Sequence, residues 1–166
     1  MKRQIILIAH NLRSCHNVGS LLRTVDGLGV DRVFLTGYTP YPLERADERL
    51  PHLAAKINKQ IQKTALGADQ SVAWQHSPDV FKVIRSLQAD GFSVVALEQS
   101  GETIELPGWK VPVHAALVVG SETDGLETGI LEACDAIVAI PMFGKKESFN
   151  VVQAAAMALY HCRFRI

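Results

Sequence analysis

The sequence has few cysteines and no long apolar run, and both absences narrow the class of protein. Its 166 residues include three cysteines, none of them spaced as C-x-x-C, so we expect neither a disulfide framework nor a zinc site. The first apolar run ends at His10, too early for a signal peptide, and no run approaches the roughly 20 residues of a membrane span. We therefore expect a soluble, cytoplasmic protein without a metal.

The charges balance overall but are unevenly placed along the chain. The 17 basic and 17 acidic residues cancel, which alone does not favour a polyanionic partner. Residues 1–63 carry ten basic and five acidic side chains, residues 64–140 carry three and eleven, and residues 141–166 carry four and one. If the two basic ends meet in the fold, they form a positive face that attracts phosphates; a solvated surface explains the same counts equally well.

Short β-branched runs alternate with segments of helical period along the whole chain. This pattern predicts an α/β fold with a mainly parallel sheet and helices on both faces. The strands are expected near residues 5–9, 32–36, 71–74, 93–97, 115–119 and 136–140. The helices are expected near residues 18–28, 53–66, 79–89, 128–133 and 148–162. No composition break resembles a linker, so residues 1–166 are expected to form a single domain without a separate RNA-binding extension.

Two features of the pattern stand apart from these elements. Residues 37–51 contain three prolines and residues 99–112 show no periodicity, so both stretches are expected to be loops. The last helix is apolar on nearly every side, which predicts that it is buried all round. One sheet face cannot cover such a helix completely, so we expect a homodimer.

A polar segment follows the first expected strand. Asn17 is a good residue to cap the helix that begins there. Arg23 lies early on this helix, at the edge of the sheet where α/β proteins hold their ligands. An ion pair between Arg23 and Asp26, three residues on, is the structural alternative.

A second segment, V-V-G-S-E-T-D-G-L-E, superficially resembles a phosphate-binding loop. Such a loop needs Lys and Ser or Thr after its last glycine, whereas here Leu126 and Glu127 follow. The segment also carries three acidic side chains, which repel phosphate. A ligand with positive charge, or a neutral ribose and adenine, suits it better.

A third segment, I-P-M-F-G-K-K-E-S-F-N, leads into the last helix. Ser148 is expected to cap that helix, whose free backbone N–H groups can bind a carboxylate or order a loop. Asn150 is expected in the first turn, where a polar amide in an otherwise apolar helix needs a hydrogen-bond partner.

Together these segments resemble a known family. N-V-G-S-L-L-R-T, V-V-G-S-E-T-D-G-L and I-P-M-F-G-K-K-E-S-F-N-V-V-Q-A-A-A are similar to the three motifs of the SpoU, or TrmH-like, branch of the SPOUT RNA methyltransferases. The resemblance spans residues 17–159. It implies a C-terminal trefoil knot, S-adenosylmethionine bound in the knot, and a homodimer with active sites at its interface. The implied reaction is methylation of a ribose 2′-hydroxyl in tRNA or rRNA, without a metal.

The resemblance also implies site residues. The candidate catalytic residues are Asn17, Arg23, Glu122, Ser148 and Asn150. The candidate cofactor-binding residues are Val119, Gly120, Glu122, Ile140, Met142, Ser148 and Phe149. Phe149 replaces the usual Leu, and Val152-Gln153 replace a small polar and an apolar residue, so the cofactor pocket is expected to be reshaped. Arg23 is expected to stabilise the developing alkoxide, because a guanidinium with a pKa above about 12 is a poor base.

Recognition of RNA is then expected to rest on basic side chains of this domain. The candidates for phosphate contacts are Arg13, Arg45, Arg49, Lys56, Lys59, Lys63, Lys145, Lys146, Arg163 and Arg165. A small dimer suits a folded stem-loop, so tRNA is favoured and rRNA stays open. Two alternatives remain: an inactive RNA-binding module of the same fold, and an unrelated α/β enzyme that binds FMN or a sugar phosphate.

Overall fold

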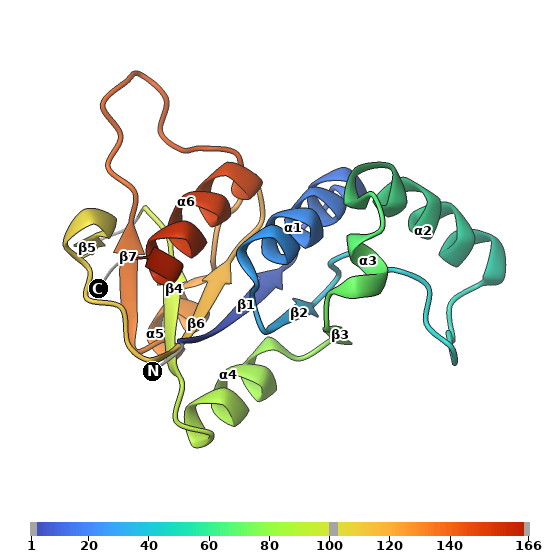
Figure 1. Ribbon diagram of the computed structural model, residues 1–166, viewed down its shortest axis with the longest axis horizontal. Helices are drawn as coiled ribbons and strands as arrows, with labels where there is room; N and C mark the ends of the chain where they lie inside the picture. Colours follow the sequence, from blue (N-terminus) through green and yellow to red (C-terminus); the bar gives the residue numbers. More distant parts are fainter. Residues whose placement is uncertain (1–2, 100–102, 165–166) are drawn as a thin grey trace.

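The computed structural model describes residues 3–99 and 103–164 and shows one parallel sheet with helices on both faces (Figure 1). The strands are β1 (Gln4–His10), β2 (Arg32–Thr36), β3 (Trp74–Ser77), β4 (Ser93–Leu97), β5 (Ile104–Glu105), β6 (His114–Val119) and β7 (Ala136–Ala139). Their order is β3-β2-β1-β6-β4-β7-β5, and every pair is parallel. The prediction of an α/β fold with a mainly parallel sheet is therefore confirmed.

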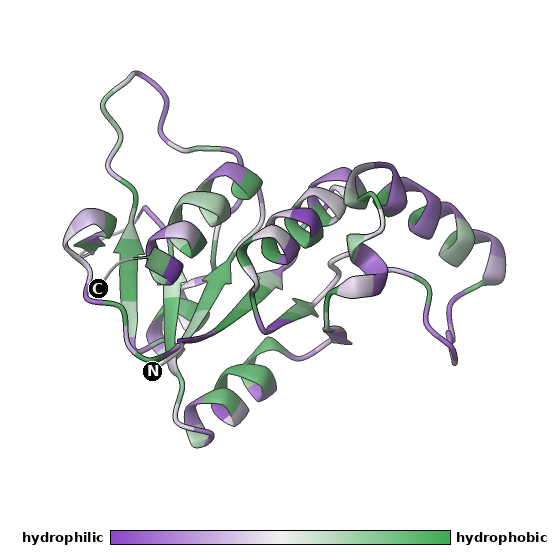
Figure 2. Ribbon diagram, viewed as in Figure 1, coloured by the Kyte–Doolittle hydropathy of each residue, from purple (hydrophilic) through white to green (hydrophobic). Residues whose placement is uncertain are grey.

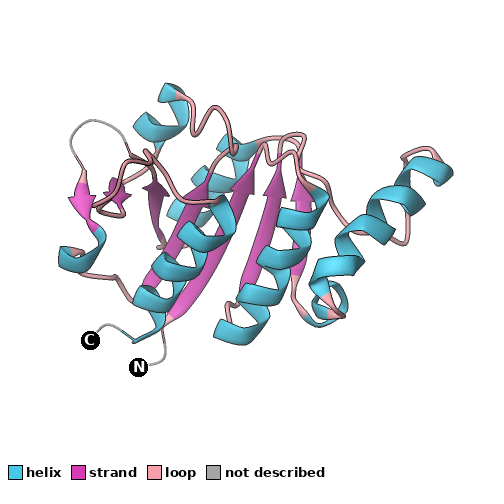
Figure 3. Ribbon diagram, turned by 90° about the horizontal axis from the view of Figure 1, so that it is seen from above, coloured by secondary structure: helices cyan, strands magenta, loops and turns pink. Residues whose placement is uncertain are grey.

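The helices divide between the two faces of the sheet. They are α1 (Cys15–Leu28), α2 (Pro51–Ala65), α3 (Ala68–Ser71), α4 (Val80–Ala89), α5 (Thr128–Ala133) and α6 (Val151–Phe164), with a 3-10 turn η1 (Leu106–Gly108). On one face, α1 and α6 pack on the strands through Leu22 and Leu159, which are fully buried. On the other face, α4 and α5 contribute Ile84 and Ile130. Figure 3 shows the sheet between its two layers of helices. The strands between them are apolar along most of their length, as expected when both faces are covered (Figure 2).

α2 packs on α1 beyond the β3 edge of the sheet (Figure 1). Gly19 on α1 allows this contact, since a Cβ atom there would overlap the Ile61 carbonyl oxygen and the Thr64 hydroxyl of α2. The Thr64 hydroxyl also donates a 2.8 Å hydrogen bond to the carbonyl oxygen of His16. Gly19 is thus needed for the close packing of α1 and α2.

Several predicted boundaries need correction. Ser71, expected in a strand, lies in α3, and the third strand starts at Trp74. α1 begins at Cys15, and its cap is Ser14, whose Oγ accepts from the backbone N–H of Asn17. Asn17 is therefore not the cap. The stretch 99–112, expected to be irregular, contains the short β5 and η1.

α6 starts at Val151, three residues later than predicted, and within one chain only one of its sides is buried, as expected if a partner subunit covers the other. Its outer stripe of Met157, Tyr160 and Phe164 is 36%, 59% and 61% exposed.

In the described part of the chain, no helix is long and apolar enough to cross a membrane. The trefoil knot that the family resemblance implies stays a prediction.

Candidate functional site

An open cleft of about 340 Å³ lies where three neighbouring strands end. Leu97 ends β4, Val119 ends β6 and Ile140 follows β7, and all three line the cleft. The other lining residues come from the loops beyond these strands and the start of α6: Glu98, Gln99, Gly120, Ser121, Glu122, Thr123, Asp124, Gly125, Glu147, Ser148, Phe149, Asn150, Val151 and Ala154. The volume falls within the range of small-molecule sites, and the place is where open α/β sheets bind ligands.

The turn after β6 requires two glycines. A Cβ atom on Gly120 would lie 2.5 Å from the carbonyl oxygen of Gly125, which is closer than real Cβ atoms approach. Gly125 has a φ of +67°, and its N–H donates a 3.0 Å hydrogen bond to the Ser121 carbonyl. The turn therefore folds back tightly at the edge of the cleft.

Glu98, which the sequence analysis did not single out, connects β4 to this turn. Its carboxylate accepts a 2.9 Å hydrogen bond from the backbone N–H of Leu126 and a 2.8 Å bond from that of Gln99. The signal that could have found it is a lone acidic residue directly after a buried strand. Glu98 shapes the cleft wall from the side of β4.

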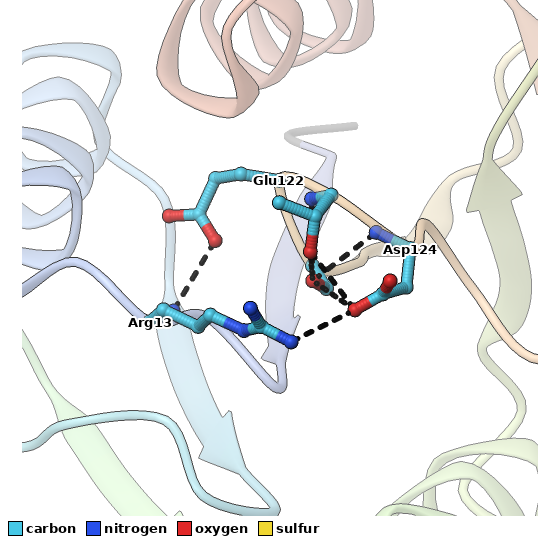
Figure 4. Close-up of polar contacts among 5 residues, drawn as sticks. Arg13, Glu122 and Asp124 are labelled. Carbon is cyan, nitrogen blue, oxygen red and sulfur yellow. Dashed lines mark hydrogen bonds and ion pairs between the residues drawn. The ribbon is translucent and has the colours of Figure 1, made fainter.

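Glu122 is joined to the segment after β1. Its carboxylate accepts a 2.7 Å hydrogen bond from the Asn17 amide. It also accepts a 3.2 Å bond from the backbone N–H of Arg13, drawn in Figure 4. Partial burial raises the pKa of Glu122, but the hydrogen bonds, chiefly that from Asn17, outweigh it and hold the pKa below its usual value. Glu122 is thus a fixed, ionised acceptor, which does not suit a general acid.

Arg13 and Asp124 form an ion pair beside Glu122. The Arg13 guanidinium lies 3.1 Å from an Asp124 carboxylate oxygen, and the side chains are 61% and 68% exposed (Figure 4). The same carboxylate accepts a 2.9 Å hydrogen bond from the Thr123 hydroxyl. At this exposure the pair contributes little to stability.

The lining of the cleft is acidic. Glu98, Glu122, Asp124 and Glu147 line it, and none of the lining residues is Lys or Arg. Such a lining favours a ligand with positive charge and disfavours phosphate, as the sequence analysis expected. Within residues 3–99 and 103–164 no group of three or more His, Cys, Asp or Glu is arranged to hold a metal ion.

The segment between β7 and α6 completes the cleft. Asn150 caps α6, since its side-chain oxygen accepts a 2.9 Å hydrogen bond from the backbone N–H of Val152. The predicted cap at Ser148 is therefore wrong; Ser148 is exposed and lies three residues before the helix. Asn150 is also exposed, so the amide expected inside an apolar helix sits at its entrance.

The structure brings most of the predicted site residues together. Those that line the cleft are Val119, Gly120, Glu122, Ile140, Ser148, Phe149 and Asn150. Asn17 reaches the cleft through its hydrogen bond to Glu122. Met142 does not line the cleft.

Arg23 lies apart from the cleft. It is the ninth residue of α1, exposed in the third turn, and it does not line the cleft of its own chain. The alternative ion pair between Arg23 and Asp26 is not formed, and the Asp26 carboxylate accepts a 2.7 Å hydrogen bond from the Ser71 hydroxyl. The only two ion pairs found among the described residues, Arg13–Asp124 and Arg49–Asp47, leave Arg23 out.

The fold and the cleft define an α/β protein with an open cleft at the carboxyl edge of a parallel sheet. A profile of the SpoU rRNA methylase family matches residues 4–160, so the chain belongs to this family. A curated relative, the 23S rRNA (guanosine-2′-O-)-methyltransferase RlmB of Neisseria meningitidis serogroup B, is 33% identical over 159 residues. The match covers 96% of this chain and 58% of that protein.

Another curated relative agrees with the family, and solved structures share the fold. A putative TrmH family tRNA/rRNA methyltransferase of Staphylococcus aureus is 30% identical over 93% of this chain and 56% of its own length. The chain thus spans somewhat more than half of these relatives. An AdoMet-bound rRNA methyltransferase from Sinorhizobium meliloti superposes with a TM-score of 0.81 at 21% identity, covering 98% of this chain and 57% of that one. The TrmH/SpoU tRNA modifying enzyme of A. aeolicus superposes with a TM-score of 0.78 at 25% identity. That match covers 98% of this chain and 76% of the other.

Proposed function

We propose that this chain binds S-adenosylmethionine in the cleft and methylates a ribose 2′-hydroxyl of RNA. The observation that carries the proposal is the convergence of the three sequence segments on one cleft: Gly120 and Glu122 from the second, Ser148 to Asn150 from the third, and Asn17 from the first through Glu122. Family membership supports the same reaction, as do the activities for which the relatives are named.

The lining of the cleft fits this cofactor in charge and shape. The acidic side chains suit a ligand that carries a sulfonium and an ammonium group. The apolar strand ends Leu97, Val119 and Ile140 provide a surface for a flat base. The same acids disfavour FMN and sugar phosphates, so the small-molecule alternative has less support.

The chain's own residues then have separable tasks. S-Adenosylmethionine, when bound, supplies an electrophilic methyl group. Asn17 holds Glu122 ionised at the cleft mouth, where the carboxylate accepts hydrogen bonds from bound groups. Ser148 and Asn150 offer hydroxyl and amide groups that orient a ribose hydroxyl. Arg23 stabilises the negative charge that develops as this hydroxyl loses its proton.

Arg23 can reach a cleft if the protein is a homodimer, which we propose as its functional state. α1 and α6 end side by side, since the Arg163 side chain near the end of α6 donates a 2.9 Å hydrogen bond to the Leu28 carbonyl at the end of α1. Arg23 therefore lies on the same side of the sheet as the exposed stripe Met157, Tyr160 and Phe164. Pairing through this stripe places Arg23 at the interface, next to the partner's cleft.

The proposed RNA substrate is tRNA, with rRNA as the second candidate, in the cytoplasm. Of the basic candidates, Arg49 and Arg163 bind backbone carbonyls of their own chain, and Arg13 pairs with Asp124. Arg165 lies outside the described residues. The candidates left on the surface, outside the two ion pairs of the described residues, are Arg45, Lys56, Lys59, Lys63, Lys145 and Lys146.

The test is labelled methyl transfer to bulk unmodified RNA. Arg23→Ala should lower turnover at least about 100-fold because charge stabilisation is lost, while the dissociation constant for S-adenosylmethionine, measured by calorimetry, stays unchanged. Arg85→Ala, on α4 at the opposite face, is the matched control and should keep full activity. Retained turnover in Arg23→Ala rejects its role, and no transfer by the unsubstituted chain rejects the function.

Complementation tests the dimer. Gly120→Val, which blocks the cleft, should be inactive alone, as should Arg23→Ala. If Arg23 serves the partner's cleft, mixing the two inactive variants restores about a quarter of the activity, because half of the randomly formed dimers contain one complete site. An inactive mixture containing exchanged dimers contradicts the arrangement.

A further inference from the structure

The loop between β7 and α6 carries an aromatic side chain that packs against nothing. This loop stands clear of the sheet (Figure 1). Phe143 is 98% exposed, more than any other large hydrophobic residue described, and the next, Leu66, is 66% exposed. The interior of a single chain gains nothing from a phenyl ring at this position, so its size and flat faces are available to a partner.

The neighbours of Phe143 are basic. Lys145 and Lys146 follow after Gly144, and all of them are exposed. Neither lysine takes part in the two ion pairs of the described residues. An exposed ring beside two cations is a surface that single-stranded nucleic acid fits, since bases stack on the ring while phosphates meet the cations.

The same loop runs directly into the cleft. Glu147, Ser148 and Phe149 line it, and Phe143 precedes Glu147 by four residues. An extended chain of that length spans at most about 14 Å, so whatever binds Phe143 lies next to whatever occupies the cleft mouth. Because methylation acts on a sugar, the base of the target nucleotide or of its neighbour stays outside the cleft and needs another support.

We infer that Phe143 stacks on a nucleobase beside the methylated ribose, and that Lys145 and Lys146 contact the adjoining phosphates. The inference deepens the proposed RNA methylation and rests on it. The ring orders the nucleotide and the cations hold its backbone, so the tip Phe143–Lys146 positions RNA, while the acidic cleft holds the cofactor. The same loop thus carries Lys145 and Lys146, which suit phosphates, next to Glu147, which belongs to the acidic lining of the cleft.

The experiment measures affinity for fluorescein-labelled unmodified tRNA transcripts by anisotropy, with S-adenosylhomocysteine present. Phe143→Ala should weaken binding about 5- to 100-fold, the usual effect of losing one stacked base. Phe143→Trp should bind within about twofold of the unsubstituted chain, whereas Phe143→Leu should bind as weakly as the alanine variant. Phe81→Ala, an exposed phenylalanine on α4, is the control and should change nothing.

Salt dependence separates the two kinds of contact. Replacing Lys145 and Lys146 by Gln should reduce the slope of log affinity against log salt by about 1.4, or about 0.7 for each phosphate contact, while Phe143→Ala leaves the slope unchanged. Full affinity in Phe143→Ala, or rescue by Leu, overturns the stacking contact. A changed sedimentation coefficient in Phe143→Ala overturns it as well, because the ring would then pack on protein.

Binding and methyl transfer are scored separately. If RNA binding depends on Phe143 but no methyl group is transferred, the proposed function fails and the stacking contact stands. If methyl transfer occurs and Phe143→Ala binds equally well, the stacking contact fails and the function stands. No RNA binding by the unsubstituted chain overturns the inference.

Discussion

The carboxyl edge of the sheet has two halves that differ although both are built on parallel strands. β4, β6 and β7 end in an open, acidic cleft. β1, β2 and β3 end in a closed cluster, where the buried His10 imidazole is 2.9 Å from the Thr36 hydroxyl and the Tyr41 ring stacks on His76 with centroids 4.0 Å apart. The Arg49 guanidinium lies 3.6 Å from the Tyr41 ring centre.

The difference teaches that a strand end becomes a site only when its loop leaves polar groups for a ligand. In the closed half, burial lowers the pKa of His10, with an opposing effect from Glu127, so the ring is neutral at pH 7. The Thr39 hydroxyl bonds the Ala9 carbonyl and the Leu12 N–H. In the open half, Glu122, Ser148 and Asn150 are exposed at the cleft. Both halves lie at the same edge of the sheet. In the closed half the polar side chains bond to one another and to the backbone, whereas in the open half polar groups stay exposed to a ligand.

The largest effect is expected from a substitution in the open half, at Gly120. Gly120→Ala places a methyl group against the Gly125 carbonyl and must deform the turn after β6. We expect S-adenosylmethionine affinity to fall at least about 100-fold by calorimetry, since displacement of a pocket wall removes several contacts at once. Gly27→Ala, an exposed helical glycine with open space around it, should keep full affinity. Normal affinity in Gly120→Ala would place the ligand elsewhere.

The second largest effect is expected from a substitution in the closed half, at Arg49. Arg49 donates hydrogen bonds to the carbonyls of Tyr41 and Pro42 and pairs with Asp47. Arg49→Ala should lower the free energy of unfolding by about 2 kcal/mol and leave cofactor affinity unchanged, because the loop loses its hydrogen bonds and cation–π contact. Arg45→Ala, exposed in the same loop, is the control in urea denaturation. A cofactor effect would show that the two halves are coupled.

A pH experiment sharpens the comparison. Because the pKa of Glu122 is held below its usual value, its ionised form stabilises the fold above about pH 4.3, and this contribution is lost as pH falls through the lowered pKa. Asn17→Ala should raise that pKa. Its free energy of unfolding should therefore be lower than that of the unsubstituted chain at pH 7 and equal to it near pH 2. A difference independent of pH contradicts the Asn17–Glu122 coupling, and Glu122→Gln is the non-titrating control.

The smallest effect concerns the exposed ion pair. Asp124→Asn should change the free energy of unfolding by less than about 1 kcal/mol, since both partners face solvent. Its effect on S-adenosylmethionine affinity should grow as salt is lowered, because one cleft charge is removed. A large loss of stability would mean that the pair holds the turn together, which its exposure argues against.

Much of the fold could be predicted because apolar runs mark strands buried on both faces. The bounds of β2, β4 and α5 match the expected ranges. Ser71 was misplaced because α3 is one turn long, and a single turn has no periodicity to detect. β5 has two exposed residues, Ile104 and Glu105, and pairs only with β7, so its strand character comes from the neighbour.

The lining of the cleft could be predicted in part. The resemblance to the family motifs singled out Gly120, Glu122 and Ser148, and all three line the cleft. Glu98 was missed, since its bond to the Leu126 N–H joins residues 28 apart and leaves no local pattern. The cap at Asn150 was missed because Ser148 is an equally good capping residue, and only the backbone decides between them.

Two arginines, Arg3 and Arg163, join the segment that leads into β1 to the end of α6 by hydrogen bonds. The Arg163 guanidinium donates to the Arg3 carbonyl at 3.3 Å, and the Arg3 guanidinium donates to the Cys162 carbonyl at 3.1 Å. These contacts join residues about 160 positions apart, so they are among the most non-local in the fold. During synthesis the segment that leads into β1 can make these bonds only after α6 has been made.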